Sequence, residues 1–270
     1  MTDRSANAAL SLDDCVVPDW RAPAGVRALV TTRRGGVSLA PYDSLNLGLH
    51  TGDDRDRVLA NRRALQALAG HARFAWLEQI HGSTIVDAAQ VADALDAGQA
   101  PPRADASVTD VPGVACIVMV ADCMPVLFSD LQGRAVGAAH AGWRGLAAGV
   151  LEQTAMAVAQ KAGAGSRVQA YLGPAIGPRK FEVGCDVFDA FVDAASPHER
   201  DATVAAFVAH AHGKYLANLA ALARVRLARA DVVAMTGGDA CTVTDSQRFY
   251  SFRRDRATGR FAGAVWLDAP

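Results

Sequence analysis

Three residues of the chain have side chains that bind transition metals: His81, Cys123 and His140. Each lies at the end of a strand-like segment or at a break between two such segments, with a small or turn-forming residue close by. One thiolate and two imidazoles suit catalytic zinc, which commonly has three protein ligands and keeps its fourth position for water or substrate. These residues predict a metal site, with a buried thiol and two hydrogen-bonded histidines as the structural alternative.

Two other kinds of chemistry suit the same residues. A set of two histidines and one cysteine also matches the trigonal ligation of blue copper, so the types of ligand do not exclude copper as the bound metal. The chain has 7 histidines, which are too few for several clustered copper sites. Without a metal, Cys123 becomes a candidate nucleophile, with His140 or His81 as its base and Asp122 nearby.

Arginines beside small residues are candidates for binding an anion such as phosphate. Arg33 begins the segment RRGGVS, whose glycines and Ser38 expose backbone N–H groups. Arg144 lies in the sequence AGWRG, four residues after His140. The pair Arg253-Arg254 is a third candidate, and its alternative is a solvated pair of charges.

The elements that position these residues are expected from hydrophobic patterning. Residues 126–129 and 135–139 are typical of two strands, and Asp130–Gly133 between them has the composition of a type I turn. A hairpin folded about the centre of this turn places Cys123 opposite His140. Opposed β-carbons lie about 4.5–5.5 Å apart, which is close enough for the two side chains to share one metal ion.

The remaining pattern mixes helices with strands. A functional ordered loop is expected over residues 31–56 and a polar connection over residues 91–103. Asp54 or Asp56 is expected to cap the helix that follows the first loop. Strands are predicted at 74–79, 83–86, 106–109, 114–120, 168–172 and near the C-terminus, and helices at 58–69, 146–161, 186–194 and 215–229. This order predicts an α+β or mixed α/β fold.

Composition limits the class of protein. The chain has 270 residues, 51% of them apolar, and a formal net charge of -1. These values favour one large domain and disfavour a protein that holds nucleic acid mainly by charge. Neither a membrane-spanning run nor an export signal is visible, and 5 scattered cysteines argue against a disulfide framework, so a reduced cytoplasmic protein is expected.

The chain resembles the YfiH-like family, which is labelled laccase-domain or polyphenol oxidase and is associated with purine nucleoside chemistry. The resemblance extends from about residue 27 to about residue 268. It is carried by motifs that occur in the family's order: TTRRGGVS, PYDSLNLG, EQIHGS, ADASVTD, VADCMPV, AAHAGWRG, YLGPAIGP, FEVG and YSFRRDRATGR.

The resemblance implies that His81, Cys123 and His140 bind a metal, with zinc expected and copper less favoured. It also implies one catalytic domain over residues 21–270, built as an α/β/β/α sandwich and related to cysteine hydrolases. Residues 1–20 lack any motif and are expected to form a mobile extension.

The activity implied by the resemblance is phosphorolysis of adenosine, inosine, guanosine and methylthioadenosine, together with deamination of adenosine. The expected partners are therefore a small nucleoside and phosphate, and the expected assembly is a monomer or homodimer. Arg33 or Arg144 would hold phosphate, and Ser38, Asn46 and Gln79 are expected to contact substrate. A Cys–His amidase acting on peptidoglycan precursors and a copper-dependent polyphenol oxidase are the alternatives.

Overall fold

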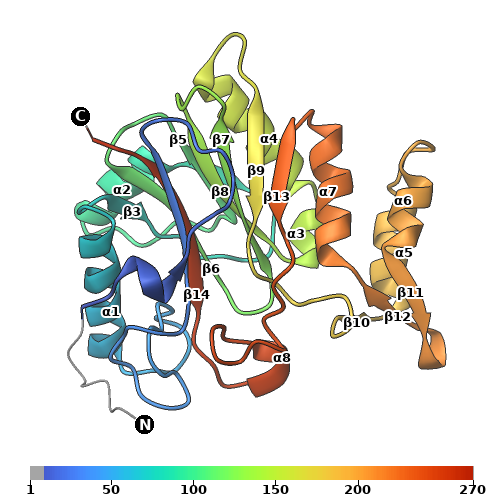
Figure 1. Cartoon of the computed structure of the whole chain (residues 1–270), viewed down its shortest axis with the longest axis horizontal. Helices are drawn as coiled ribbons and strands as arrows, with labels where there is room; N and C mark the ends of the chain where they lie inside the picture. Colours follow the sequence, from blue (N-terminus) through green and yellow to red (C-terminus); the bar gives the residue numbers. More distant parts are fainter. Residues whose placement is uncertain (1–8, 270) are drawn as a thin grey trace.

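The structure is a computed structural model and describes residues 9–269. Two large β-sheets lie face to face, and helices cover their outer faces (Figure 1). The strands are β1 (Cys15–Val16), β2 (Val26–Thr31), β3 (Arg73–Ala75), β4 (Ile85–Asp87), β5 (Ala106–Thr109), β6 (Val114–Val120), β7 (Met124–Asp130), β8 (Val136–Ala141), β9 (Val168–Leu172), β10 (Glu182–Val183), β11 (Phe207–His210), β12 (Lys214–Ala217), β13 (Ala234–Gly237) and β14 (Phe261–Leu267).

The α-helices and the two 3-10 turns connect these strands. They are η1 (Leu12–Asp14), α1 (Arg55–Leu68), α2 (Ala88–Asp96), α3 (Trp143–Ala147), α4 (Val150–Ala162), α5 (Cys185–Val192), α6 (Arg200–Ala205), η2 (Ala211–Gly213), α7 (Leu219–Arg229) and α8 (Phe252–Asp255). None of the helices in this part of the chain is long and apolar enough to cross a bilayer.

Side chains that face opposite sides of each strand allow the two sheets and the helices to pack as layers. The first sheet has the strand order β1-β2-β14-β6-β3, and the second has β13-β9-β7-β8-β5-β4. On β6, Cys116 and Val118 pack with residues of the second sheet, such as Leu127, whereas Ile117 packs with α1 through Leu65. Because successive strand residues face opposite sides, each sheet buries both faces. The predicted mixed α/β fold with α/β/β/α layering is therefore confirmed.

The outer face of the second sheet is covered by α4 and α7, while α1 covers the first sheet (Figure 1). On β7, Val126 and Phe128 face these helices and contribute to the largest apolar cluster. The small sheet β10-β12-β11 and helices α5 and α6 form a lobe beside α7 (Figure 1). Its aromatic residues Phe191 and Phe207 join the same cluster.

The β7–β8 hairpin forms, but its register differs from the expected one. His140 pairs with Pro125, and Cys123 lies immediately before β7 in a bend. The loop is longer than a two-residue connection, because Asp130 donates its N–H to the carbonyl of Ala135 across it. The prediction that Cys123 lies directly opposite His140 is therefore wrong by two positions.

Other differences from the expected elements follow from packing. The expected connection over residues 91–103 contains most of α2, whose Val91 is buried. The helix expected over 146–161 is divided into α3 and α4 by Gly149, which has φ of 87°. The expected helix over 215–229 begins with strand β12, which pairs with β10 and β11. Helix α2 and strand β12 depend on packing and pairing with neighbouring elements, which local patterning does not show.

The N-terminal segment packs against the domain where the structure describes it. Residues 1–8 lie outside the described part of the chain. Leu10 and Trp20 are buried, and β1 pairs with β2 at the edge of the first sheet. The second half of the expected mobile extension is therefore part of the packed structure.

Candidate metal centre and cavity

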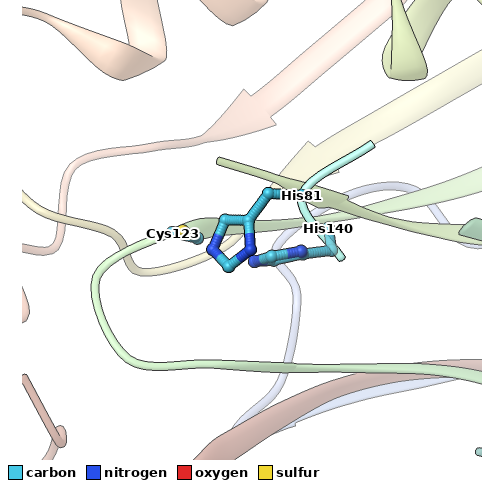
Figure 2. A group of neighbouring side chains, drawn as sticks. All are labelled: His81, Cys123 and His140. Carbon is cyan, nitrogen blue, oxygen red and sulfur yellow. The ribbon is translucent and has the colours of Figure 1, made fainter. Parts of the chain in front are cut away.

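The three predicted metal ligands converge in the structure. His81 lies in the loop between β3 and β4, Cys123 follows β6, and His140 lies near the end of β8. Their ligand atoms all lie within 4.8 Å of one another. Figure 2 shows the three side chains meeting from separate segments, with the two imidazole rings close together. His140 is buried, Cys123 is half-buried and His81 is exposed, so the group opens toward solvent.

A buried carboxylate orients two of these residues. Asp105, the residue before β5, has its Oδ1 atom 2.8 Å from Nδ1 of His140. The same carboxylate accepts hydrogen bonds from the backbone N–H groups of Ile80, His81 and Gly82. Because Nδ1 of His140 is held by Asp105, Nε2 is the nitrogen left to bind a ligand.

The backbone around the three residues has unusual geometry. His81 has φ of 62° and Asp122 has φ of 95°, a region that costs residues with a β-carbon about 1–2 kcal/mol. Asp122 is held there by bonds from Thr242 Oγ1 and the N–H of Arg253, both 2.6 Å long. A β-carbon on Gly142 would lie 2.9 Å from Cys123 Sγ and 3.0 Å from His81 Cδ2. A side chain at position 142 would therefore press on two of the three candidate metal ligands.

The charges of the site stabilise a thiolate next to an imidazolium. Burial raises the pKa of the Cys123 thiol, but the charge of His140 and hydrogen bonds from His140 and His81 outweigh burial and lower the pKa to about 6. Burial lowers the pKa of His140, but the charge of Cys123 and the bond to Asp105 outweigh it and raise the pKa to about 9. A depressed thiol pKa is typical of thiols that bind metals or act as nucleophiles.

The three residues form part of the wall of a cavity of about 450 Å³, a size typical of small-molecule sites. Apolar side chains make up much of the wall, and three basic residues also contribute to it. The apolar residues are Met119, Val120, Ala121, Trp143, Ile176, Phe181, Leu219 and Phe252, and the basic residues are His50, Arg253 and Arg260.

Three of the residues predicted to bind phosphate or substrate lie outside the cavity lining: Arg33, Ser38 and Arg144. Arg33 donates to the backbone carbonyls of Asp43 and Ser246 and pairs with the Asp43 carboxylate. Arg33 is not among the residues that line the cavity. Ser38 is buried and accepts a hydrogen bond from Asn61. Arg144 is exposed, and its guanidinium lies 4.4 Å from the centre of the Trp143 ring, outside the cavity lining.

The two predicted substrate-orienting amides bind the protein itself. Gln79 lines the cavity, but its amide both donates to the carbonyl and accepts from the N–H of Met119, each bond being 2.8 Å long. Asn46 is fully buried and accepts from the backbone N–H groups of Gly48 and Arg260. Both amides therefore bind backbone groups of residues that line the cavity.

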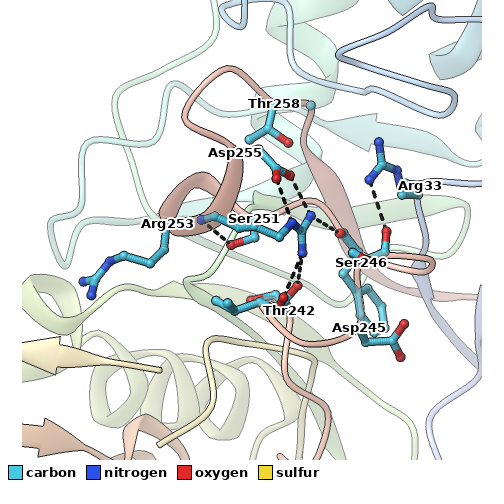
Figure 3. Close-up of polar contacts among 12 residues, drawn as sticks. Arg33, Thr242, Asp245, Ser246, Ser251, Arg253, Asp255 and Thr258 are labelled. Carbon is cyan, nitrogen blue, oxygen red and sulfur yellow. Dashed lines mark hydrogen bonds and ion pairs between the residues drawn. The ribbon is translucent and has the colours of Figure 1, made fainter. Parts of the chain in front are cut away.

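The two arginines of the Arg253-Arg254 pair have different surroundings. Arg254 donates to the carbonyls of Thr242 and Phe249 and pairs with Asp255, so it is a structural anchor. In Figure 3 the side chain of Arg253 extends away from this network. Arg253 lines the cavity and donates to the carbonyl of Glu182.

Sequence reasoning missed Asp105, His50 and Arg260. Asp105 is in the motif ADASVTD, and Arg260 is the last residue of YSFRRDRATGR. The motifs identify these two segments of the chain but give no role to either side chain. Nothing in the local pattern distinguishes His50 from an ordinary loop residue.

Comparisons with known proteins show the family of the chain. Residues 27–268 match the family model described as multi-copper polyphenol oxidoreductase laccase. A purine nucleoside phosphorylase of Pseudomonas aeruginosa is 52% identical over 253 residues, covering 93% of this chain and 98% of that protein. Purine nucleoside phosphorylase YfiH of Escherichia coli is 49% identical over 256 residues, with the same coverage of 93% and 98%.

Solved structures show the same fold. A crystal structure of a Neisseria meningitidis protein has a TM-score of 0.85 and 48% identity, covering 95% of this chain and 100% of that one. YlmD of Geobacillus stearothermophilus has a TM-score of 0.83 and 33% identity, covering 91% and 93%. The chain therefore belongs to the YfiH-like family, whose model has a laccase description and whose matched relatives include proteins named purine nucleoside phosphorylases.

Proposed function

We propose that this chain is a zinc-dependent purine nucleoside phosphorylase acting on adenosine, inosine, guanosine and methylthioadenosine, with adenosine deaminase activity. The observation that carries this proposal is the group His81, Cys123 and His140 in the wall of an apolar cavity of about 450 Å³. The names of the relatives support the nucleoside as the substrate class.

The donor set fits zinc. Two imidazoles and one thiolate within 4.8 Å of one another match the ligands of catalytic zinc sites and leave a coordination position for a small molecule. Asp105 supplies the carboxylate that commonly accompanies a zinc-bound histidine. When bound, zinc would supply Lewis-acid polarisation and would favour the deprotonation of water near neutral pH.

The residues of the chain suit the binding of a purine nucleoside. Trp143, Phe181 and Phe252 offer apolar and aromatic surface for the base. In phosphorolysis, an oxygen of hydrogen phosphate bonds to C1′ of the sugar as the C1′–N9 bond breaks. The electron pair of that bond goes to the purine, which takes the phosphate proton. In deamination, water adds at C6 of adenosine and ammonia leaves.

A cysteine amidase is the second candidate, and one observation favours it. His140 lies between Cys123 and Asp105, and the Asp105–His140 bond is 2.8 Å long. This order of thiol, imidazole and carboxylate is that of a nucleophile, its base and the group that orients the base. The substrate class proposed for that activity is an amide of a peptidoglycan precursor. The copper-dependent oxidase has no comparable support beyond the family description.

We propose a cytoplasmic location on the basis of cysteine chemistry. All 5 cysteines are free thiols, including the exposed Cys185. Such thiols persist in a reducing compartment.

The proposal is tested by metal content and base release. Protein purified without added metal is expected to contain one zinc per chain and to release adenine from adenosine only when phosphate is present. His81→Ala should lose zinc and deamination together, whereas His198→Ala, which changes an exposed histidine outside the cavity, should retain both. Amide hydrolysis that persists in metal-stripped protein and is lost in Cys123→Ala would establish the amidase instead. Copper together with phenol oxidation would establish the oxidase.

A further inference from the structure

Two basic residues that are far apart in the sequence line the same cavity as the candidate metal ligands. His50 lies near the end of the long loop that precedes α1, and Arg260 is the residue before β14. Arg260 lines the same cavity as Cys123 and as Asp122. Its positive charge is therefore placed next to the candidate metal site.

The motif segment Asn46-Leu47-Gly48 holds Arg260 in place. The side-chain oxygen of Asn46 accepts from the N–H of Arg260 at 2.8 Å, and the N–H of Leu47 donates to the carbonyl of Arg260 at 3.0 Å. A β-carbon on Gly48 would lie 2.9 Å from Cγ of Arg260, so glycine leaves room for the arginine side chain. This segment of the motif PYDSLNLG therefore positions Arg260 in the cavity wall.

The guanidinium of Arg260 has no carboxylate within 4.0 Å among residues 9–269. Its Nη1 atom donates to the carbonyls of Thr258 and Gly259, and those are the only acceptors it has in this part of the chain. The Arg260 side chain is half-buried, so its guanidinium loses part of its hydration. A partly buried cation of this kind is stabilised by an anion.

Other positive charge surrounds the same place. Arg62 of α1 donates to the carbonyl of Leu47, and its charge acts on His50 together with that of Arg260. Burial and these two arginines lower the pKa of His50, so its imidazole is neutral near pH 7 and offers an N–H donor without adding charge.

We propose that Arg260 and His50 form a binding subsite for a tetrahedral phosphate oxyanion, and that inorganic phosphate occupies it as the co-substrate. This inference rests on the proposed phosphorylase function. The planar guanidinium can bind two phosphate oxygens at once, which a point charge cannot do. The nucleoside base then occupies the apolar part of the cavity, and phosphate occupies the basic part.

Steady-state kinetics with inorganic phosphate as the varied substrate test the assignment. Arg260→Gln is expected to raise the KM for phosphate about tenfold or more, because a charge-assisted hydrogen bond is lost. The KM for adenosine should change much less. Arg260→Lys retains the charge and should recover part of the loss. Arg63→Gln removes an exposed arginine of α1 outside the cavity and should leave the phosphate KM unchanged.

Gly48→Ala provides a second variant that retains every charge. Its added methyl group would lie 2.8 Å from Cγ2 of Thr51 and 2.9 Å from Cγ of Arg260, so both side chains are displaced and the phosphate KM should rise although the arginine is present. Thermal unfolding of each variant establishes that it is folded. An unchanged phosphate KM in folded Arg260→Gln and Gly48→Ala, with wild-type phosphorolysis intact, would overturn the subsite and leave the proposed function standing.

Direct binding separates the two proposals and the two sources of phosphate. Calorimetric titration of the wild type and Arg260→Gln uses inorganic phosphate in one arm and adenosine 5′-monophosphate in the other. Arg260-dependent binding of inorganic phosphate supports the subsite, even if the wild type releases no base and the proposed function fails. Dependence on Arg260 in the nucleotide arm alone would overturn the assignment, because the site would then bind a nucleotide phosphate group.

Discussion

Oδ1 of Asp105 lies 2.8 Å from Nδ1 of His140, and the backbone N–H of His81 donates to the same oxygen at 2.9 Å. One buried carboxylate therefore positions two of the three candidate metal ligands. The bonds from His140 and the loop N–H groups outweigh the effect of burial and lower the pKa of Asp105, so it remains ionised. Such groups orient metal ligands without touching the metal.

Asp105→Asn should therefore weaken metal binding by about 10–100-fold without preventing folding. The amide has one acceptor oxygen in place of two, so it cannot satisfy the three N–H groups and His140 as the carboxylate does. Competition with a chromophoric chelator measures the zinc affinity. Asp189→Asn, at an exposed position of α5, is the matched control. Equal affinities in the two variants would show that Asp105 does not support the metal site.

Gly142→Ala should abolish metal binding through steric exclusion alone. The new β-carbon would meet Cys123 Sγ at 2.9 Å and His81 Cδ2 at 3.0 Å, and these atoms must move apart to accept it. Because φ of Gly142 is -73°, alanine causes no backbone strain there. Elemental analysis of the purified variant gives the metal content, and circular dichroism shows whether it is folded. A folded variant with a full metal content would contradict this view of the site.

Gln79→Glu should destabilise the protein by about 2 kcal/mol. The amide of Gln79 donates to the carbonyl of Met119 and accepts from its N–H, but a carboxylate can only accept and would face the carbonyl without a proton between them. Urea unfolding measures the loss, with the exposed Gln99→Glu as control. If Gln79 instead orients substrate, the variant would keep its stability and show a raised nucleoside KM.

The ion pair between Glu199 and Arg229 should make stability depend on pH in the acid range. The bond from Arg229 lowers the pKa of Glu199 from 4.5 to about 2. A lowered carboxyl pKa stabilises the fold above the unfolded value of 4.5, and this contribution is lost as the pH falls from there toward 2.

Glu199→Gln should therefore lower the free energy of unfolding by about 1 kcal/mol at pH 7, with a difference that shrinks below pH 4.5. Urea unfolding of both proteins at several pH values gives the comparison. A difference that stays constant down to pH 2 would show that the carboxylate charge is not responsible. The readout also tests how the side lobe is held, because Arg229 is on α7 and Glu199 immediately precedes α6.

The sequence by itself determined which side chains form the candidate metal site. Thiol and imidazole are chemically distinctive, and His81, Cys123 and His140 stand in the motifs EQIHGS, VADCMPV and AAHAGWRG. The strands β5, β6 and β9 also agree with the predicted ranges, because buried strands are continuous apolar runs bounded by turn residues.

Only the tertiary structure decided which polar residues support that site. Arg33 and Asn46 lie in loop motifs that suggest ligand binding, yet Arg33 is paired with Asp43 and Asn46 holds the backbone of Arg260. The roles of Asp105 and Arg260 depend on contacts between strands of two sheets and loops more than 20 residues away in the chain. Local patterning specifies which face of a strand is apolar, whereas the groups that a polar side chain contacts depend on how the sheets pack.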